Sequence, residues 1–336
     1  MKTYFTNGTM GDVKYFIDDL AEFQIQELAG DNSNRYIYPG DTINYTLDSE
    51  LVKLYAVLRD LYFDDVDRYY EELAVLPIWV QEAGQNSDCA IDVDLFCELI
   101  NAEESRKIPN LYKHLYLVDC QFLVGTIQNL LSAMEDAFVR YYMTLANMRE
   151  NDAYKRLTDP NGTICITSED SRCASALLEI YFIKAYSILD ILCKICYEIQ
   201  EKQSDFSQYK KIKSADVLWG FRKKLLINET ENTLFEKCDL VSMIESLRNE
   251  SVHNGTWELN PKIFVRYDEG IVGERFMLFP DMLQGRLATV KSRKHFFSKS
   301  IKVNSVLPCI HAEFKQRLMQ TLVTINGQWQ ELANQC

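Results

Sequence analysis

The chain has 336 residues, of which 47% are hydrophobic and 25% are charged. This apolar content excludes a disordered chain, and the length exceeds what one hydrophobic core usually organises, so we expect two packed regions. The charge is uneven, because residues 1–150 hold 11 Lys and Arg against 26 Asp and Glu, whereas residues 151–336 hold 25 against 23. The acidic half would repel a phosphate backbone, so only the second half is expected to approach nucleic acid easily.

No stretch of the sequence has the form of a membrane span or a secretory signal. Residues 174–199 are the most apolar stretch, but charged residues that include Glu179, Lys184, Asp190 and Lys194 interrupt it, and each would be costly at a bilayer centre. The N-terminus lacks the apolar run of a secretory signal. We therefore expect a cytoplasmic protein with no membrane association.

Ten cysteines are scattered along the chain without the paired spacings of a zinc site. The segment Cys193-Lys-Ile-Cys196 has the spacing of a redox or half-zinc motif, but it lies inside a helical pattern and no second pair accompanies it. A packed-core role for these two thiols is favoured. We expect no cofactor and no metal.

Helical spacing of apolar residues dominates the first region, residues 1–155. It predicts a helix over residues 11–28, a core-facing helical stripe over residues 51–73, and a long helix over residues 111–148 that Pro109 precedes. A second stripe, made of Asp60, Asp64, Asp67 and Glu71, is more typical of a solvated face than of a metal site, because no histidine accompanies it. The first region is thus predicted to be all-helical, and we expect a regulatory, dimerising or partner-binding role for it.

A turn and a strand mark the boundary between the two predicted regions. Asp159-Pro-Asn-Gly162 is a strong turn signal, and residues 163–167 have short strand character. Ser168 is a candidate N-cap for a core-facing helix that runs to about Gln200. The second region is therefore placed at residues 168–336.

Residues 202–224 form a locally basic segment with interleaved aromatic residues. Such a segment is either an ordinary solvated face or a surface for RNA. The candidates for RNA binding here are Lys210, Lys211, Lys213, Arg222, Lys223 and Lys224.

The next predicted helix carries an unusual group of polar residues near its end. Thr233-Leu-Phe-Glu236 has the form of a capping box that opens this helix, and Gly255 is expected to end it. The apolar stripe of the helix consists of Leu240, Val241, Ile244, Leu247 and Val252. Arg248 falls where this periodicity asks for an apolar side chain, so a charge is expected near the core face.

Arg248, Asn249 and His253 are the candidate catalytic residues. Asn249 and His253 are four residues apart and share a helix face, whereas the longer Arg248 side chain must reach round to join them. Asp190 is a possible supporting residue. It either faces the interior and holds Arg248, or forms a plain surface pair with Lys194.

Two further segments follow this helix. Residues 262–279 alternate in polarity and contain the turn Asp268-Glu-Gly270, which predicts a β-hairpin. Residues 286–302 hold six Lys and Arg and no acid, so they form either a second basic patch near the site, with Arg293 and Lys294 as RNA-binding candidates, or a mobile charged loop. A final helix is predicted over residues 306–332.

The order Arg248, Asn249, three further residues and His253 resembles the signature of the HEPN superfamily. The resemblance covers about residues 168–260. It implies that this helix is the fourth of an up-and-down helical bundle, and that two protomers place their motifs face to face as a composite endoribonuclease site. The fold class expected is therefore all-α, with two helical regions, the second a HEPN-like bundle with a small β-hairpin appended. The resemblance assigns catalysis to Arg248 and His253 and a supporting role to Asn249.

These residue types suit RNA cleavage without a metal ion. Attack by the ribose 2′-hydroxyl needs a base, an acid for the leaving oxygen and positive charge beside the phosphorane. His253 can transfer protons near neutral pH, Arg248 can bind phosphate oxygens, and Asn249 can orient the imidazole. Two such sets across a homodimer would provide both acid and base, and the products would carry 2′,3′-cyclic phosphate and 5′-hydroxyl ends.

We therefore expect a metal-independent endoribonuclease that acts on RNA, with the toxin or antiviral-effector role that the resemblance suggests. A partner or inhibitor protein would bind the acidic first region. The main alternative is a HEPN-like module that binds RNA or protein without cutting. A third reading is a helical scaffold in which the motif is accidental.

Overall fold

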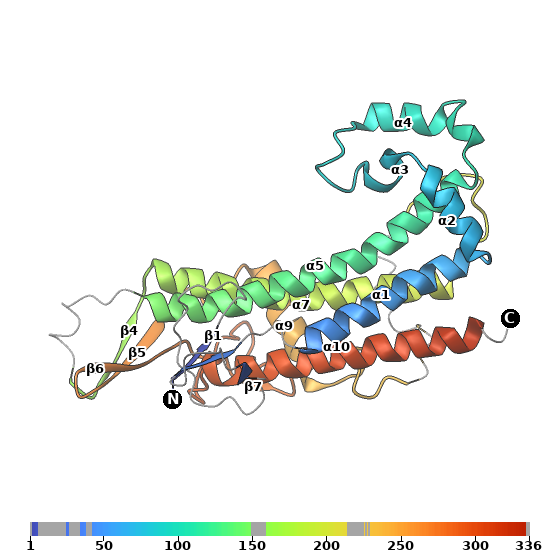
Figure 1. Ribbon diagram of the computed structural model, residues 1–336. Helices are drawn as coiled ribbons and strands as arrows, with labels where there is room; N and C mark the ends of the chain where they lie inside the picture. The colour runs from blue at the N-terminus through green and yellow to red at the C-terminus, as the bar shows by residue number, and fades with distance from the viewer. Residues whose placement is uncertain are drawn as a thin grey trace. The chain divides into compact units, whose positions relative to one another are not determined.

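The computed structural model describes residues 2–5, 25–26, 34–37, 42–148, 159–213, 225, 227 and 229–333. In this part the chain is mostly helical, with short strands near its start and a small antiparallel sheet (Figure 1). Unit 1 comprises Met1–Leu47, Asn129–Leu189 and Thr230–Thr321, and unit 2 comprises Asp48–Gln128, Asp190–Glu229 and Leu322–Cys336. Unlike the predicted regions 1–155 and 168–336, these units are not consecutive stretches of sequence, because four long helices each continue from one unit into the other.

The start of the chain contains strands, so the prediction of an all-helical first region is wrong here. Strand β3 (Asn34–Ile37) pairs in parallel with β1 (Lys2–Phe5) and antiparallel with β2 (Ile25–Gln26). The predicted helix 11–28 does not reach residue 28, since β2 occupies residues 25–26, and its residues 11–24 lie outside the described residues. Apolar spacing alone did not reveal the pairing of these short segments.

Two helices replace the single stripe predicted over residues 51–73. Helix α1 (Thr42–Tyr62) ends where Asp65 caps α2 (Val66–Val75), by accepting a hydrogen bond from the backbone N–H of Arg68 at 3.0 Å. This cap satisfies a donor at the helix start and favours a new helix over continuation. The acidic stripe, Asp60, Asp64, Asp67 and Glu71, is exposed at all four positions, as a solvated face requires.

Short helices complete this part of unit 2. They are α3 (Ile78–Glu82), α4 (Val93–Asn101) and the 3-10 turn η1 (Ser105–Lys107). The buried face of α3 and the start of the following long helix form one apolar cluster, which consists of Trp79, Val80, Ala83, Leu111 and Leu115.

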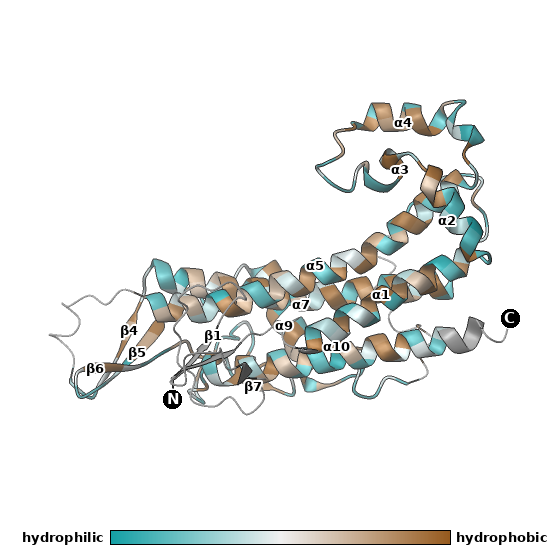
Figure 2. Ribbon diagram, in the orientation of Figure 1, coloured by the Kyte–Doolittle hydropathy of each residue, from teal (hydrophilic) through white to brown (hydrophobic). Residues whose placement is uncertain are grey.

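Three of the long helices match the predictions closely. They are α5 (Leu111–Asn147), α7 (Glu169–Gln200) and α10 (Val303–Ala333), and Figure 2 shows polar and apolar residues interleaved along them. Ser168 caps α7 as expected, by accepting a hydrogen bond from the N–H of Ser171 at 3.3 Å. None of the helices described here is long and apolar enough to cross a membrane.

Each unit has its own core between these helices. In unit 1, the rings of Phe138 (α5) and His311 (α10) stack with centroids 4.4 Å apart, and Tyr181 (α7) packs against both. In unit 2, Tyr62 (α1) contacts the ring of Tyr116 (α5) at 6.0 Å. The thiols of Cys193 and Cys196 are also buried, and burial raises the pKa of Cys196 well above its usual value, which agrees with the packed-core interpretation.

A three-stranded antiparallel sheet extends the predicted hairpin. Strands β5 (Ile263–Asp268) and β6 (Ile271–Phe276) pair through a turn in which Glu269 and Gly270 have φ of 53° and 80°, and β4 (Thr163–Ile166) adds to the other edge of β5. A second small hairpin joins β7 (Met282–Leu283) and β8 (Arg286–Leu287). The expected fold class holds in the coarse sense of a mostly helical protein with a small sheet, and the HEPN-like bundle stays a prediction.

Candidate functional site

The candidate motif lies on α9 (Asp239–Asn254), which begins later than predicted. Thr233 and Glu236 do not form a capping box, because each is engaged elsewhere. The Thr233 hydroxyl donates to the carbonyl of Thr230 at 2.6 Å, and the Glu236 carboxylate accepts a hydrogen bond from Arg317 of α10 at 2.6 Å. Helix α9 instead starts after Cys238, which makes no side-chain capping bond.

Helix α9 ends just before Gly255, as predicted from the sequence. Gly255 follows the helix with φ of 87°, a left-handed conformation that glycine adopts without a steric penalty. The buried face is made by Leu240, Val241, Ile244 and Leu247, as expected. Its last member is the acidic Glu250 rather than Val252, which is 47% exposed, so the predicted place of Val252 in the stripe is wrong.

Two of the three motif residues are joined directly. The Nη1 atom of Arg248 donates a hydrogen bond to Oδ1 of Asn249 at 2.8 Å. The guanidinium carbon lies 5.0 Å from the ring centroid of Tyr186 on α7, within the range of a cation–π contact. This aromatic surface explains how a charged side chain is held half-buried where the periodicity calls for an apolar one.

His253 lies on the last turn of α9 and is exposed. It shares a helix face with Asn249, four residues earlier, whereas Arg248 is roughly 140° away around the helix axis at 100° per residue. Among the contacts of the described residues, none joins His253 to Arg248 or Asn249. The arrangement therefore consists of a bonded Arg248–Asn249 pair with an accessible imidazole one turn further on.

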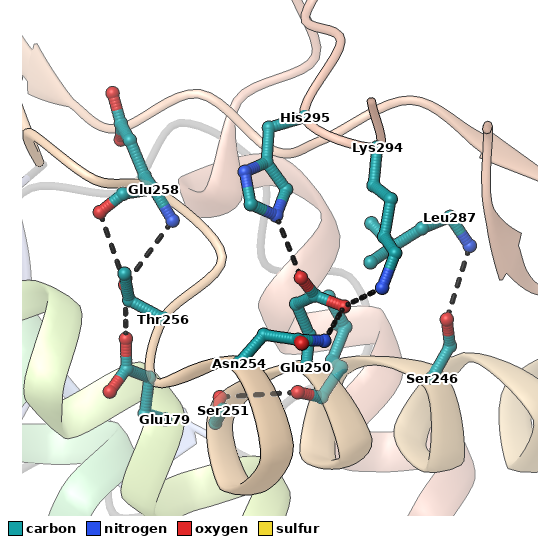
Figure 3. Close-up of polar contacts among 11 residues, drawn as sticks. Glu179, Ser246, Glu250, Ser251, Asn254, Thr256, Glu258, Leu287, Lys294 and His295 are labelled. Carbon is teal, nitrogen blue, oxygen red and sulfur yellow. Dashed lines mark hydrogen bonds and ion pairs between the residues drawn. The ribbon is translucent and has the colours of Figure 1, made fainter. Parts of the chain in front are cut away.

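A cluster that the motif does not include surrounds Glu250 (Figure 3). The Glu250 side chain is only 7% exposed, and its carboxylate accepts from Nζ of Lys294 and from Nδ2 of Asn254, both at 2.9 Å. Nε2 of His295 lies 3.2 Å from the other carboxylate oxygen. Burial by itself would raise the pKa of Glu250, but these bonds outweigh it and hold the pKa below its usual value. The carboxylate is therefore charged near neutral pH.

The second basic segment is thus brought to α9, as one of its two interpretations expected. Besides Lys294, the segment contributes the backbone N–H of Leu287, which donates to the Ser246 hydroxyl at 3.2 Å (Figure 3). The loop is also anchored on buried Asp281, which accepts from the N–H and hydroxyl of Ser298. Arg293 is exposed on this loop, and RNA binding by Arg293 and Lys294 stays a prediction.

Sequence reasoning missed the partnership of Glu250 and His295. Glu250 occupies a variable position of the motif, and His295 does not fit the motif spacing, because Val290 rather than an arginine lies five residues before it. The one available signal was that Glu250 falls three residues after Leu247, on the buried face of the helix, where an acid requires a partner.

The described aromatic residues of the first basic segment, Phe206 and Tyr209, pack within unit 2. The Phe206 ring makes edge contacts with Tyr62 and Tyr116 at 5.4 and 5.9 Å, and the Tyr209 hydroxyl donates to Asp119. The lysines of this segment, Lys210, Lys211 and Lys213, are exposed, and Lys210 pairs with Asp205 at 3.3 Å. Arg222, Lys223 and Lys224 lie outside the described residues. The aromatic residues that are described anchor this segment, and RNA binding by its lysines stays a prediction.

Asp190 lies on α7, one turn beyond Tyr186, and is half-buried. It belongs to unit 2, whereas Arg248 belongs to unit 1. Both expected roles for Asp190 stay predictions.

In the part of the chain that the structure describes, no group of three or more His, Cys, Asp and Glu side chains is arranged to hold a metal ion. Comparison of the chain with protein-family models, curated proteins and solved structures finds no match. The resemblance to the HEPN superfamily therefore depends on Arg248, Asn249 and His253 and on their place at the end of α9.

Proposed function

We propose that the protein is a metal-independent endoribonuclease whose site is the C-terminal end of α9. One observation carries the proposal: Arg248 is bonded to Asn249 at 2.8 Å, and His253 is exposed one turn further along the same helix. A permanently charged guanidinium and an accessible imidazole are the two kinds of group that phosphodiester cleavage needs when no metal ion takes part.

The roles of the three residues follow from their chemistry. His253 exchanges a proton with the reacting hydroxyl groups, because an exposed imidazole can act as a general base or a general acid. Arg248 binds the phosphate oxygens through the guanidinium donors that Asn249 does not use, and stabilises the charge that develops on the phosphorane. The bond to Asn249 and the ring of Tyr186 hold the guanidinium in place before RNA binds.

The proposal includes RNA as substrate and a homodimer that brings two motifs together, as in the family that the motif resembles. It also includes a regulatory partner for the acidic first region, where negative charge favours a basic protein over nucleic acid. A role as a toxin or antiviral effector belongs to the same proposal.

The second candidate is a module that binds RNA or protein without cleaving it. The observation in its favour is that Arg248 already has two partners, Asn249 and Tyr186, which would stabilise the packing of α9 without any chemistry. In that case the motif residues would be needed for folding and not for catalysis.

Purified protein incubated with total RNA separates these candidates. We expect wild type to cleave RNA equally well with and without EDTA, and Arg248→Ala and His253→Ala to lose activity by about 10²–10⁴-fold. Lys237→Ala, which removes an exposed charge just before α9, serves as the control for altered surface charge and should cleave normally. Circular dichroism checks that each variant is folded.

Equal cleavage by wild type and both motif variants would show that the activity lies elsewhere. Absence of cleavage by wild type, together with RNA binding that the variants lose, would favour the second candidate.

A further inference from the structure

The end of α9 holds a second imidazole beside the motif. His295 comes from the loop after β8, and its Nε2 atom lies 3.2 Å from the carboxylate of Glu250 (Figure 3). Glu250 is nearly inaccessible, whereas the side chains of His295 and Lys294 are 32% and 34% exposed. A buried carboxylate thus holds an imidazole and an ammonium group that remain partly accessible to solvent.

This cluster lies next to the motif histidine. Glu250 and His253 are three residues apart on α9, a spacing that places their Cβ atoms about 5–6 Å from each other. Asn254, the residue after His253, binds the same carboxylate at 2.9 Å. The Glu250 carboxylate therefore brings His295 to the helix end that presents His253.

We infer that His295 is a second catalytic residue of the proposed ribonuclease, that Glu250 is its positioning residue, and that Lys294 contributes positive charge beside the scissile phosphate. The inference rests on the proposed function and deepens it, because one chain then holds both of the proton-transfer groups that the reaction requires. A second copy of the motif is not needed to balance the protons.

The reaction balances with these groups alone. His253 as base takes the proton of the ribose 2′-hydroxyl while the 2′-oxygen forms a bond to phosphorus. The bond from phosphorus to the 5′-oxygen breaks, and that oxygen takes a proton from His295. The products are a 2′,3′-cyclic phosphate and a 5′-hydroxyl, and exchange of protons with water restores both imidazoles.

The surroundings of His295 suit the role of acid. The Nε2 atom of His295 lies 3.2 Å from the Glu250 carboxylate, Glu258 from the segment between α9 and β5 is a second carboxylate close to it, and Lys294 binds the same Glu250 carboxylate. Asn254 satisfies the Glu250 carboxylate without adding charge. His253 is the base because it is exposed and has no carboxylate contact among the described residues.

The experiment compares wild type with His295→Gln and Glu250→Gln on one RNA substrate, with kcat measured from pH 5 to pH 9. Lys291→Gln is the matched control, because it removes an exposed charge from the same loop. We expect a bell-shaped profile for wild type and Lys291→Gln, and a loss of about 10²–10⁴-fold for His295→Gln together with loss of the alkaline limb. Glu250→Gln should move the alkaline limb to lower pH, since the imidazolium then lacks its carboxylate.

The outcomes separate the inference from the proposed function. If His253→Ala abolishes cleavage while His295→Gln keeps the rate and profile of wild type, the role of His295 is overturned and the proposed function stands. A slower His295→Gln with an unchanged profile would make His295 only an anchor of the loop, which also overturns the inference. If wild type cleaves no RNA, both the proposed function and the role of His295 are overturned.

Discussion

Three of the described histidines, His253, His295 and His311, differ sharply in their surroundings. His253 and His295 can be reached from solvent, whereas His311 is buried between the ring of Phe138 and the hydroxyl of Tyr181, which lies 3.3 Å from its Nδ1. Burial, together with the nearby charge of Lys315, holds the pKa of His311 far below its usual range. The buried imidazole therefore contributes to stability only while it is neutral.

This burial predicts a specific dependence of stability on pH. The pKa of His311 is lower in the folded chain than in the unfolded chain, so the unfolded chain binds more protons, and stability falls as the pH drops below about 6.5. We expect thermal melts between pH 7 and pH 5 to show a smaller loss of Tm for His311→Phe, which keeps a ring against Phe138, than for wild type. Equal losses would contradict the assignment.

The motif residues could be found from the sequence, but their partners could not. Arg248, Asn249 and His253 are close in sequence, and the helical spacing that stops at Gly255 places them near a helix end. Glu250 meets Lys294 and His295 across more than forty residues, and no local pattern reports such a contact. The contact between Arg248 and the ring of Tyr186 likewise joins residues that are far apart in sequence.

At the scale of elements, periodicity predicted the long helices well and their starts less well. Helices α5, α7 and α10 follow the apolar spacing, because each buries a continuous stripe. The start of α9 and the break between α1 and α2 were not predicted, because each depends on the hydrogen-bond partner of a polar residue near the helix start. Glu236 binds Arg317 across the fold, and Asp65 caps a new helix. Strands β1–β3 are too short for their own spacing to identify them.

The β7–β8 hairpin sets the position of the loop that carries His295. Its turn glycine, Gly285, has φ of 69° and packs against the start of α9, where a Cβ atom would lie 2.8 Å from Cα of Asp239. Gly255 also has a positive φ, but a Cβ atom there would meet nothing within 4 Å. Both positions favour glycine, and only Gly285 lacks room for a side chain.

Alanine at these two positions should therefore have unequal effects. We expect Gly255→Ala to lower the free energy of unfolding by about 1–2 kcal/mol through backbone strain alone. Gly285→Ala should lower it by about 2–5 kcal/mol, because the clash with α9 adds to the same strain. Chemical denaturation measures both values. Equal losses would mean that the hairpin does not pack against α9 as described.

Over the full length of the chain, the excess of acidic over basic residues and the proposed site lie in different halves of the sequence. The net charge is −13, and the acidic residues are concentrated in residues 1–150. The proposed site, in contrast, uses Arg248, Lys294 and two histidines from the other half. Under the proposed function, this difference in charge would let the second half approach RNA more easily than the first half, and the acidic first region would be the one to bind a basic partner.

Under the proposed function, the end of α9 activates a ribose 2′-hydroxyl. An RNA oligonucleotide that the intact protein cuts at one position tests it directly, when compared with the same oligonucleotide carrying a single 2′-deoxyribose on the 5′ side of that bond. We predict cleavage of the first to 2′,3′-cyclic phosphate and 5′-hydroxyl ends, and no cleavage of the second at that bond. Cutting of both at the same bond, or products with 3′-hydroxyl and 5′-phosphate ends, would overturn the proposed role of the 2′-hydroxyl.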